Sequence, residues 1–199
     1  MSRAPATWKG FDLAELGRRF GVRLVGAACL VPYLTEAGDV YREKLFPIAV
    51  TASGCRTTWL GPSKPQIPYG LETLRLGGEV AFLTEGESDC WALRLAFEET
   101  PVLGVPGASA WQTEWAELLD SVEVVYLSFD GDDAGRRLAD RVWADLGRKA
   151  RWVRMLRGLD TRDVLQRYGA HVFEAMLRDA DYGHELGVAF DARAEAIGP

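Results

Sequence analysis

Two acidic clusters in the middle of the sequence each follow an apolar segment. The first is residues 85–89 (EGESD) after the apolar residues 80–83, and the second is residues 130–133 (DGDD) after residues 122–129. If both segments are neighbouring parallel strands, their carboxylates meet at one edge of the sheet. Two unit negative charges about 4 Å apart repel by roughly 4 kcal/mol at an effective dielectric of about 20, so such a cluster requires a compensating cation. Hard oxygen ligands without a nearby imidazole or thiolate favour Mg²⁺, with Mn²⁺ as a possible substitute.

Within each cluster, some carboxylates suit a cation better than others. Glycine after Glu85 lets the chain turn sharply or approach a ligand closely. Asp89 lies near the first turn of the next helix, where it can face Glu85, although helix capping by Ser88 or Asp89 is an alternative. Asp130 and Asp132 flank a glycine and can point to the same side of a loop, whereas Asp133 can instead cap the following helix.

From residue 80 onward, strand-like segments alternate with amphipathic segments, which predicts a parallel α/β sheet. The expected strands are residues 80–84, 101–105, 122–129 and 150–156. The expected helices between and after them are residues 88–99, 110–120, 133–147, 161–168 and 171–179. This order places both acidic clusters at the carboxyl ends of strands.

The first part of the chain has a different pattern. A short amphipathic helix over residues 11–20 precedes apolar segments at residues 30–34, 40–50 and 55–60, which are separated by turn residues and predict an antiparallel β-rich unit. We therefore expect an N-terminal subdomain of residues 1–76, a sheet domain of residues 77–170, and a C-terminal helix and tail of residues 171–199.

Composition restricts the function classes. The 199 residues are 48% hydrophobic and 26% charged, enough for one substantial core and a smaller second unit. A net charge of −6 argues against a protein that coats nucleic acid by bulk electrostatics, but it allows a local basic groove. Candidates for such a groove are the arginine-dense residues 136–137, 148–157 and 162–167. The alternative is that these arginines lie on solvated helix faces. No segment has the length of a membrane span or a signal-peptide core, so we expect a cytoplasmic protein without a membrane partner. The three cysteines and two histidines lack the spacing of a zinc finger.

The acidic clusters resemble the Toprim domain shared by primases, topoisomerases and some nucleases. The Glu-Gly-x-x-Asp and Asp-x-Asp-x-x-Gly-Arg patterns of that domain match Glu85, Gly86, Asp89, Asp130, Asp132, Gly135 and Arg136. The resemblance covers roughly residues 79–168 and implies a Rossmann-like parallel sheet flanked by helices. A later acidic pair of primases is similar to Asp160 and Asp163, although capping by Asp160 or Thr161 explains that pair equally well.

The resemblance also implies roles. Glu85 would be the catalytic acid or base, and Asp130 and Asp132 would complete the catalytic set and bind Mg²⁺. Further metal ligands would be Asp89, Asp160 and Asp163. Gly86, Gly107 and Arg136 would lie against the nucleotide or nucleic acid, although an ordinary strand-to-helix loop also explains Gly107. Phosphoryl transfer gains chiefly from positioning and from neutralisation of charge by metal ions, which suits a site made of carboxylates.

The segment before this domain is similar to the one that precedes Toprim in primase catalytic cores, on the basis of Val31-Pro32-Tyr33, Tyr41-Arg42-Glu43-Lys44 and Lys64-Pro65. Arg42, Lys44 and Lys64 are then candidates to hold nucleotide phosphates or the template backbone, with surface solubility as the alternative. The expected function is Mg²⁺-dependent synthesis of short primers from nucleoside triphosphates on single-stranded DNA, in phage or mobile-element replication. A Toprim nuclease and a non-catalytic nucleic-acid-binding accessory module remain alternatives. Because the sequence contains neither the zinc-binding nor the helicase domain of larger primases, we expect a helicase or a zinc-binding protein as a partner.

Overall fold

The chain divides into two compact units, Met1–Glu72 and Thr73–Pro199. The computed structural model describes residues 7–48, 57–156 and 158–180. The sequence boundary expected after residue 76 falls at the end of the short 3-10 helix η1, Leu71–Leu76, which links the two units.

The N-terminal unit begins with the short antiparallel strands β1 (Thr7–Trp8) and β2 (Phe11–Asp12), followed by helix α1 (Leu13–Phe20). The helix starts later than residue 11 because Asp12 is its N-cap: the carboxylate accepts hydrogen bonds from the backbone nitrogens of Ala14 (2.6 Å) and Glu15 (3.1 Å). The predicted helix is therefore confirmed with a shifted start.

An antiparallel sheet completes this unit, in the strand order β3-β4-β5-β6. Its strands are β3 (Arg23–Val25), β4 (Ala28–Leu34), β5 (Val40–Pro47) and β6 (Thr58–Leu60). The antiparallel β-rich prediction is confirmed, although β3 was not predicted. Those parts of the predicted strands 40–50 and 55–60 that fall in residues 49–56 lie outside the described residues.

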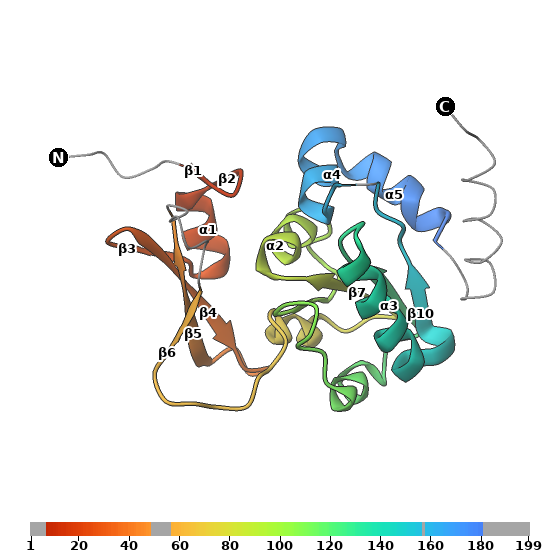
Figure 1. The fold of residues 1–199 in the computed structure, drawn as a ribbon, viewed down its shortest axis with the longest axis horizontal. Coiled ribbons are helices and arrows are strands. Elements are labelled where there is room, and N and C mark those ends of the chain that lie inside the picture. Colours follow the sequence, from red (N-terminus) through yellow and green to blue (C-terminus); the bar gives the residue numbers. More distant parts are fainter. Residues whose placement is uncertain (1–6, 49–56, 157, 181–199) are drawn as a thin grey trace. The chain divides into compact units, whose positions relative to one another are not determined.

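The second unit is built on a parallel sheet with the strand order β10-β9-β7-β8 (Figure 1). Its strands are β7 (Val80–Glu85), β8 (Val102–Val105), β9 (Val124–Ser128) and β10 (Ala150–Trp152). All three pairings are parallel, which confirms the α/β prediction. Each predicted strand is present, and β10 is much shorter than residues 150–156.

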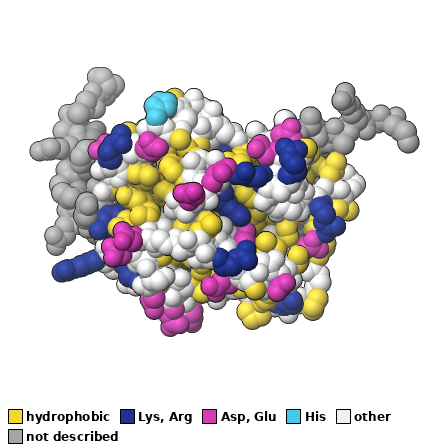
Figure 2. All heavy atoms as spheres, turned by 180° about the vertical axis from the view of Figure 1, so that it is seen from behind, with side chains coloured by type: hydrophobic (Ala, Val, Ile, Leu, Met, Phe, Trp, Pro, Cys, Tyr) yellow, Lys and Arg dark blue, Asp and Glu magenta, His cyan; other side chains and the backbone are white. Residues whose placement is uncertain are grey.

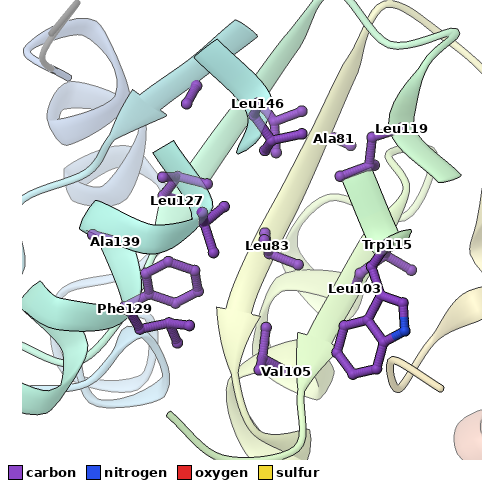
Figure 3. Packing of buried hydrophobic residues seen from close by; sticks show 14 of the residues in the cluster. Ala81, Leu83, Leu103, Val105, Trp115, Leu119, Leu127, Phe129, Ala139 and Leu146 are labelled. Carbon is purple, nitrogen blue, oxygen red and sulfur yellow. The ribbon is translucent and has the colours of Figure 1, made fainter. Parts of the chain in front are cut away.

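One face of this sheet carries the main core of the unit. Alternate strand residues such as Leu83, Leu103 and Leu127 point toward helix α3 (Asp133–Leu146) and the 3-10 helix η2 (Thr113–Leu119), and are buried there (Figure 3). The α-helix predicted over residues 110–120 is thus wrong in type and length, because only a short 3-10 segment forms. A second 3-10 turn, η3 (Gly147–Lys149), follows α3.

The opposite face is covered by α2 (Glu87–Ala96), α4 (Thr161–Tyr168) and α5 (Ala170–Arg178). Phe82, which alternates with Leu83, has its ring centroid 5.2 Å from that of Phe97 and 6.1 Å from that of Phe173 on α5. Helix α4 packs against both α2 and α5. This contact brings the start of α4 close to the acidic residues of α2.

The predicted tail beyond residue 180 lies outside the described residues. Among the helices in the described part of the chain, none combines the length and the apolar character that crossing a membrane requires.

Candidate active site

The carboxyl ends of β7 and β9 bring the two acidic clusters to the same edge of the sheet. Thr84 on β7 is paired with Ser128 on β9, so that Glu85 and Asp130 leave adjacent parallel strands. On the other side of β7, Glu85 is paired with Val105, the last residue of β8, and Gly107 follows two residues later. The two acidic clusters therefore lie at the sheet edge that the strand order predicts.

Glu85 is a largely buried carboxylate without a complete set of hydrogen bonds. Its Oε2 atom is shielded from solvent and has no hydrogen-bond partner. Burial, followed by the negative charges of Asp130 and Asp132, raises the pKa of Glu85 to about 7, and a hydrogen bond from the Ala108 backbone opposes this rise. A carboxyl group in this state exchanges its proton near neutral pH and retains an oxygen for a proton or a cation.

Gly86 forms the turn between the last residue of β7, Glu85, and the first residue of α2, Glu87. Its backbone has φ 88° and ψ 177°, a conformation that residues with a Cβ rarely adopt. Its backbone nitrogen donates a hydrogen bond to the Val105 carbonyl at 2.8 Å. Gly86 is also the N-cap of α2 and makes no side-chain capping bond. The helix-capping alternative for Ser88 and Asp89 is therefore not what the structure shows.

The loop after β8 is tied to α3 and also contacts Glu85. Arg141 on α3 donates to the Ala108 carbonyl, and Trp111 Nε1 donates to Asp145 Oδ2 at 2.7 Å. The Ala108 backbone nitrogen donates to Glu85. Gly107 stands beside this contact with φ 114°. Sequence reasoning missed the role of Arg141, because its bond partner is a backbone carbonyl that carries no sequence signal.

Asp130 and Asp132 follow β9 but have different surroundings. Burial raises the pKa of Asp130 to about 6, with further contributions from Asp160 and Asp132. Asp132 is the N-cap of α3, because its Oδ1 accepts from the backbone nitrogens of Ala134 (2.9 Å) and Gly135 (2.8 Å). Asp132, and not Asp133, thus caps this helix.

Gly135 is required by a close approach of the backbone. A Cβ at this position would clash with the carbonyl oxygen of Asp130 and lie 3.0 Å from its backbone nitrogen. The glycine of the Asp-x-Asp-x-x-Gly pattern therefore lets the first turn of α3 pack against the residue that carries the first aspartate. The following Arg136 is exposed and pairs with Asp133 on the same helix.

Asp89 lies in the first turn of α2 and is only 4% exposed. Its Oδ1 accepts a hydrogen bond from the backbone nitrogen of Arg162, at the start of α4, at 2.9 Å. Burial is the largest cause that raises the pKa of Asp89 to about 8, followed by the charge of Asp160. Asp89 therefore connects α2 to α4 and is mainly protonated at neutral pH.

The start of α4 is anchored to the end of β9 as well. The hydroxyl oxygens of Thr161 and Ser128 are 2.6 Å apart, and Thr161 Oγ1 also donates to the Ser128 carbonyl at 3.2 Å. Asp160 caps α4, with its Oδ1 accepting from the Asp163 backbone nitrogen at 2.6 Å. The capping alternative for Asp160 is therefore observed.

The predicted metal ligands surround one edge of the sheet without forming a preassembled metal centre. In residues 7–48, 57–156 and 158–180, no three Asp, Glu, His or Cys side chains are arranged to hold an ion together. The donors nevertheless suit a hard divalent cation. They are all carboxylate oxygens, Glu85 Oε2 lacks a partner, and burial followed by repulsion from neighbouring carboxylates raises the pKa of Glu85 and Asp130. Glu85, Asp130 and Asp132 therefore remain the predicted ligands of a divalent cation.

The predicted basic residues of the N-terminal unit lie beside aromatic rings. Arg42 Cζ is 4.8 Å and Lys44 Nζ 5.4 Å from the ring centroid of Trp59. Lys64 Nζ donates to the Tyr41 carbonyl at 2.8 Å. Lys44 is only 8% exposed, so surface solubility does not describe it.

Comparison with known proteins agrees with the geometry. Residues 82–165 match the Toprim-like family. The gene 57 protein of Mycobacterium phage D29 is 31% identical over 106 residues, which cover 53% of this chain and 67% of the phage protein. The chain therefore belongs to one family with this phage protein, and its residues 82–165 are similar to the Toprim-like family.

Solved structures extend the fold similarity to primase catalytic cores. The Aquifex aeolicus primase fragment with zinc-binding and RNA polymerase domains is 21% identical, has a TM-score of 0.64, and is matched over 87% of this chain and 47% of its own. A chain from a bacteriophage T7 complex, in which primase domains are bound to an RNA/DNA hybrid and dTTP, is 22% identical with a TM-score of 0.70 over 85% of this chain and 88% of its own. This chain has the fold of a primase catalytic core and spans less than half of the Aquifex fragment.

Proposed function

We propose that this protein is a primase-like nucleotidyltransferase that joins nucleotides on single-stranded DNA in phage or mobile-element replication. The observation that carries the proposal is Glu85, a largely buried carboxylate at the end of the central strand with an unpartnered oxygen and a pKa of about 7. A group with these properties suits general acid–base work at neutral pH.

In the proposed reaction, the 3′-hydroxyl oxygen of one nucleotide attacks the α-phosphorus of a nucleoside triphosphate. The new O3′–P bond forms, the bond from the α-phosphorus to the bridging oxygen breaks, and pyrophosphate leaves. Glu85 accepts the proton of the 3′-hydroxyl. Asp130 and Asp132 lie at the same sheet edge as Glu85. When bound, Mg²⁺ or Mn²⁺ supplies neutralisation of the phosphate charge.

The fold favours nucleotide joining over cleavage. The similarity to primase catalytic cores includes the N-terminal unit as well as the sheet domain, since it covers more than four-fifths of the chain. In that unit, Arg42, Lys44 and Lys64 are the proposed contacts to phosphates, together with Gly86, Gly107 and Arg136 of the sheet domain.

Local contacts of this kind suit the surface charge. On the face drawn in Figure 2, basic and acidic side chains are interspersed. Binding to nucleic acid then depends on a few placed residues, and we propose that a helicase or zinc-binding partner contributes the remaining contacts.

The direct test is oligomer synthesis. Single-stranded templates, ribo- or deoxyribonucleoside triphosphates and Mg²⁺ or Mn²⁺ should yield short products with the wild type and with Asp133→Asn, and none with Glu85→Gln. Asp133 is a suitable control because it is an exposed carboxylate at the start of α3, directly after Asp132. Absence of product across templates and metals would refute the proposal, and cleavage of labelled DNA or RNA without nucleotides would support a nuclease instead.

A non-catalytic accessory role is the second candidate. It is favoured by the absence of a preassembled three-ligand group in the described residues and by Arg162, whose guanidinium pairs with Asp160 inside the acidic cluster. In that case, binding to single-stranded DNA should be the same in the wild type and in the Asp130→Asn, Asp132→Asn double variant, with no turnover in either.

A further inference from the structure

Arg162 places a positive charge within the acidic cluster. Its Nη2 donates to Asp160 Oδ2 at 2.7 Å and lies 3.6 Å from Asp163 Oδ1. The three side chains are each between 21% and 23% exposed. Solvent and salt screen such a partly buried group of charges much less than an exposed surface pair.

The backbone of Arg162 is fixed by contacts to distant parts of the chain. Its nitrogen donates to Asp89 Oδ1, and the preceding Thr161 is bonded to the end of β9 through Ser128. The Thr161–Ser128 bond is buried and the Arg162–Asp89 bond is partly buried, so the start of α4 is attached both to α2 and to the sheet. The guanidinium therefore has a defined position beside the carboxylates.

The carboxylates differ in how far the protein itself satisfies them. Both oxygens of Asp160 have partners, Oδ1 in the Asp163 backbone nitrogen and Oδ2 in Arg162. Glu85 Oε2 has none. A divalent cation needs oxygen lone pairs and uncompensated negative charge, and these remain on the Glu85 side of the cluster.

We infer that Arg162 is a built-in cation that neutralises the Asp160–Asp163 side of the cluster and confines divalent metal binding to a single ion at Glu85, Asp130 and Asp132. Arg162 is thus a positioning residue, and Asp160 and Asp163 are not metal ligands in the wild-type protein. The inference rests on the proposed function only because it assumes the same divalent cation and the same ligands, Glu85, Asp130 and Asp132.

Binding of Mn²⁺, followed by the electron paramagnetic resonance signal of the free ion, tests this arrangement. The wild type should bind about one Mn²⁺ per chain, and Arg162→Gln should bind a second ion or bind the first at least about tenfold more tightly, because a nearby positive charge is removed. Arg162→Lys keeps the charge and should retain the wild-type stoichiometry. Arg178→Gln, which removes the same charge from the last turn of α5, is the control and should change the affinity by less than about twofold.

The double variant Asp160→Asn, Asp163→Asn gives an independent test that does not depend on whether Arg162→Gln folds. It should still bind about one Mn²⁺ per chain, because asparagine caps a helix about as well as aspartate does and the proposed ligands are untouched. The affinity should fall by no more than about tenfold, because only negative charge near Asp130 is removed. A loss of more than about tenfold in this variant would overturn the inference, as would unchanged binding in folded Arg162→Gln or a wild type that binds no Mn²⁺. A wild type that binds one ion but makes no oligomer would refute the proposed function and still support the inference.

Discussion

Replacing Glu85 with glutamine should stabilise the protein at alkaline pH while it abolishes oligomer synthesis. The pKa of Glu85 is raised from an ordinary 4.5 to about 7, chiefly by burial and then by Asp130 and Asp132. Because the folded state holds this proton more tightly than the unfolded chain does, the wild type loses stability as pH rises from about 4.5 through about 7. Glutamine has the same shape and carries no charge, so this loss should be absent from the variant.

The size of the effect follows from the pKa. A change from 4.5 to about 7 corresponds to about 3 kcal/mol between the two protonation states if no screening occurs. Glu85 is partly exposed, and solvent screening reduces this to about 1 to 2 kcal/mol at pH 8. At pH 5 the carboxyl group is protonated in the folded protein, and the difference between variant and wild type should fall below about 0.5 kcal/mol.

Urea unfolding of the wild type, Glu85→Gln and the exposed control Asp133→Asn at pH 5 and pH 8 measures these differences. Asp133→Asn should track the wild type at both pH values. Mg²⁺ at about ten times its Kd should stabilise the wild type by about 1.4 kcal/mol at pH 8 and Glu85→Gln by less. A Glu85→Gln variant that is less stable than the wild type at pH 8, or a stability difference that does not depend on pH, would refute the reasoning.

Three further substitutions test the scaffold of the site. Gly135→Ala should lower the free energy of unfolding by about 2 to 4 kcal/mol in urea titrations, because the added Cβ clashes with the Asp130 backbone. An ordinary glycine-to-alanine change inside a helix increases stability, so a gain in stability would contradict the close contact between Gly135 and Asp130. Thr161→Val should cost about 1 to 2 kcal/mol by leaving Ser128 without its buried partner, and the double variant with Ser128→Ala should cost less than the sum of the two single changes. Arg141→Met should lower the rate of oligomer synthesis about tenfold, because the loop that carries Ala108 and its bond to Glu85 loses its attachment to α3. The free energy of unfolding should change by less than about 1 kcal/mol. An unchanged rate would show that the loop holds its position without the bond from Arg141.

The controls for the arginine and threonine variants are residues of the same type at other positions. Arg137→Met, on the same helix as Arg141, should leave the rate of oligomer synthesis unchanged. Thr113→Val, which changes an exposed threonine at the start of η2, should change stability by less than about 0.5 kcal/mol.

The sequence alone determined the sheet and the edge at which the site lies. Apolar segments that alternate with amphipathic ones are a local signal, and the acidic residues that follow residues 80–84 and 122–129 lie at strand ends in any parallel arrangement of those strands. The same local logic correctly placed α2, α3, α4 and α5. It failed over residues 110–120, where packing of Trp115 and Leu119 on the sheet selected a short 3-10 helix.

The tertiary structure decided which carboxylates already have hydrogen-bond or ion-pair partners within the protein. Asp89 and Arg162 are bonded across 73 residues, and Thr161 and Ser128 across 33, and no periodicity in the sequence encodes such pairs. Gly135 appeared in the sequence only as part of a motif, and its physical reason is a backbone contact that exists after folding. Spacing and the family resemblance together pointed to six carboxylates. Only the folded chain shows that Asp160 pairs with Arg162 while Glu85 Oε2 has no partner.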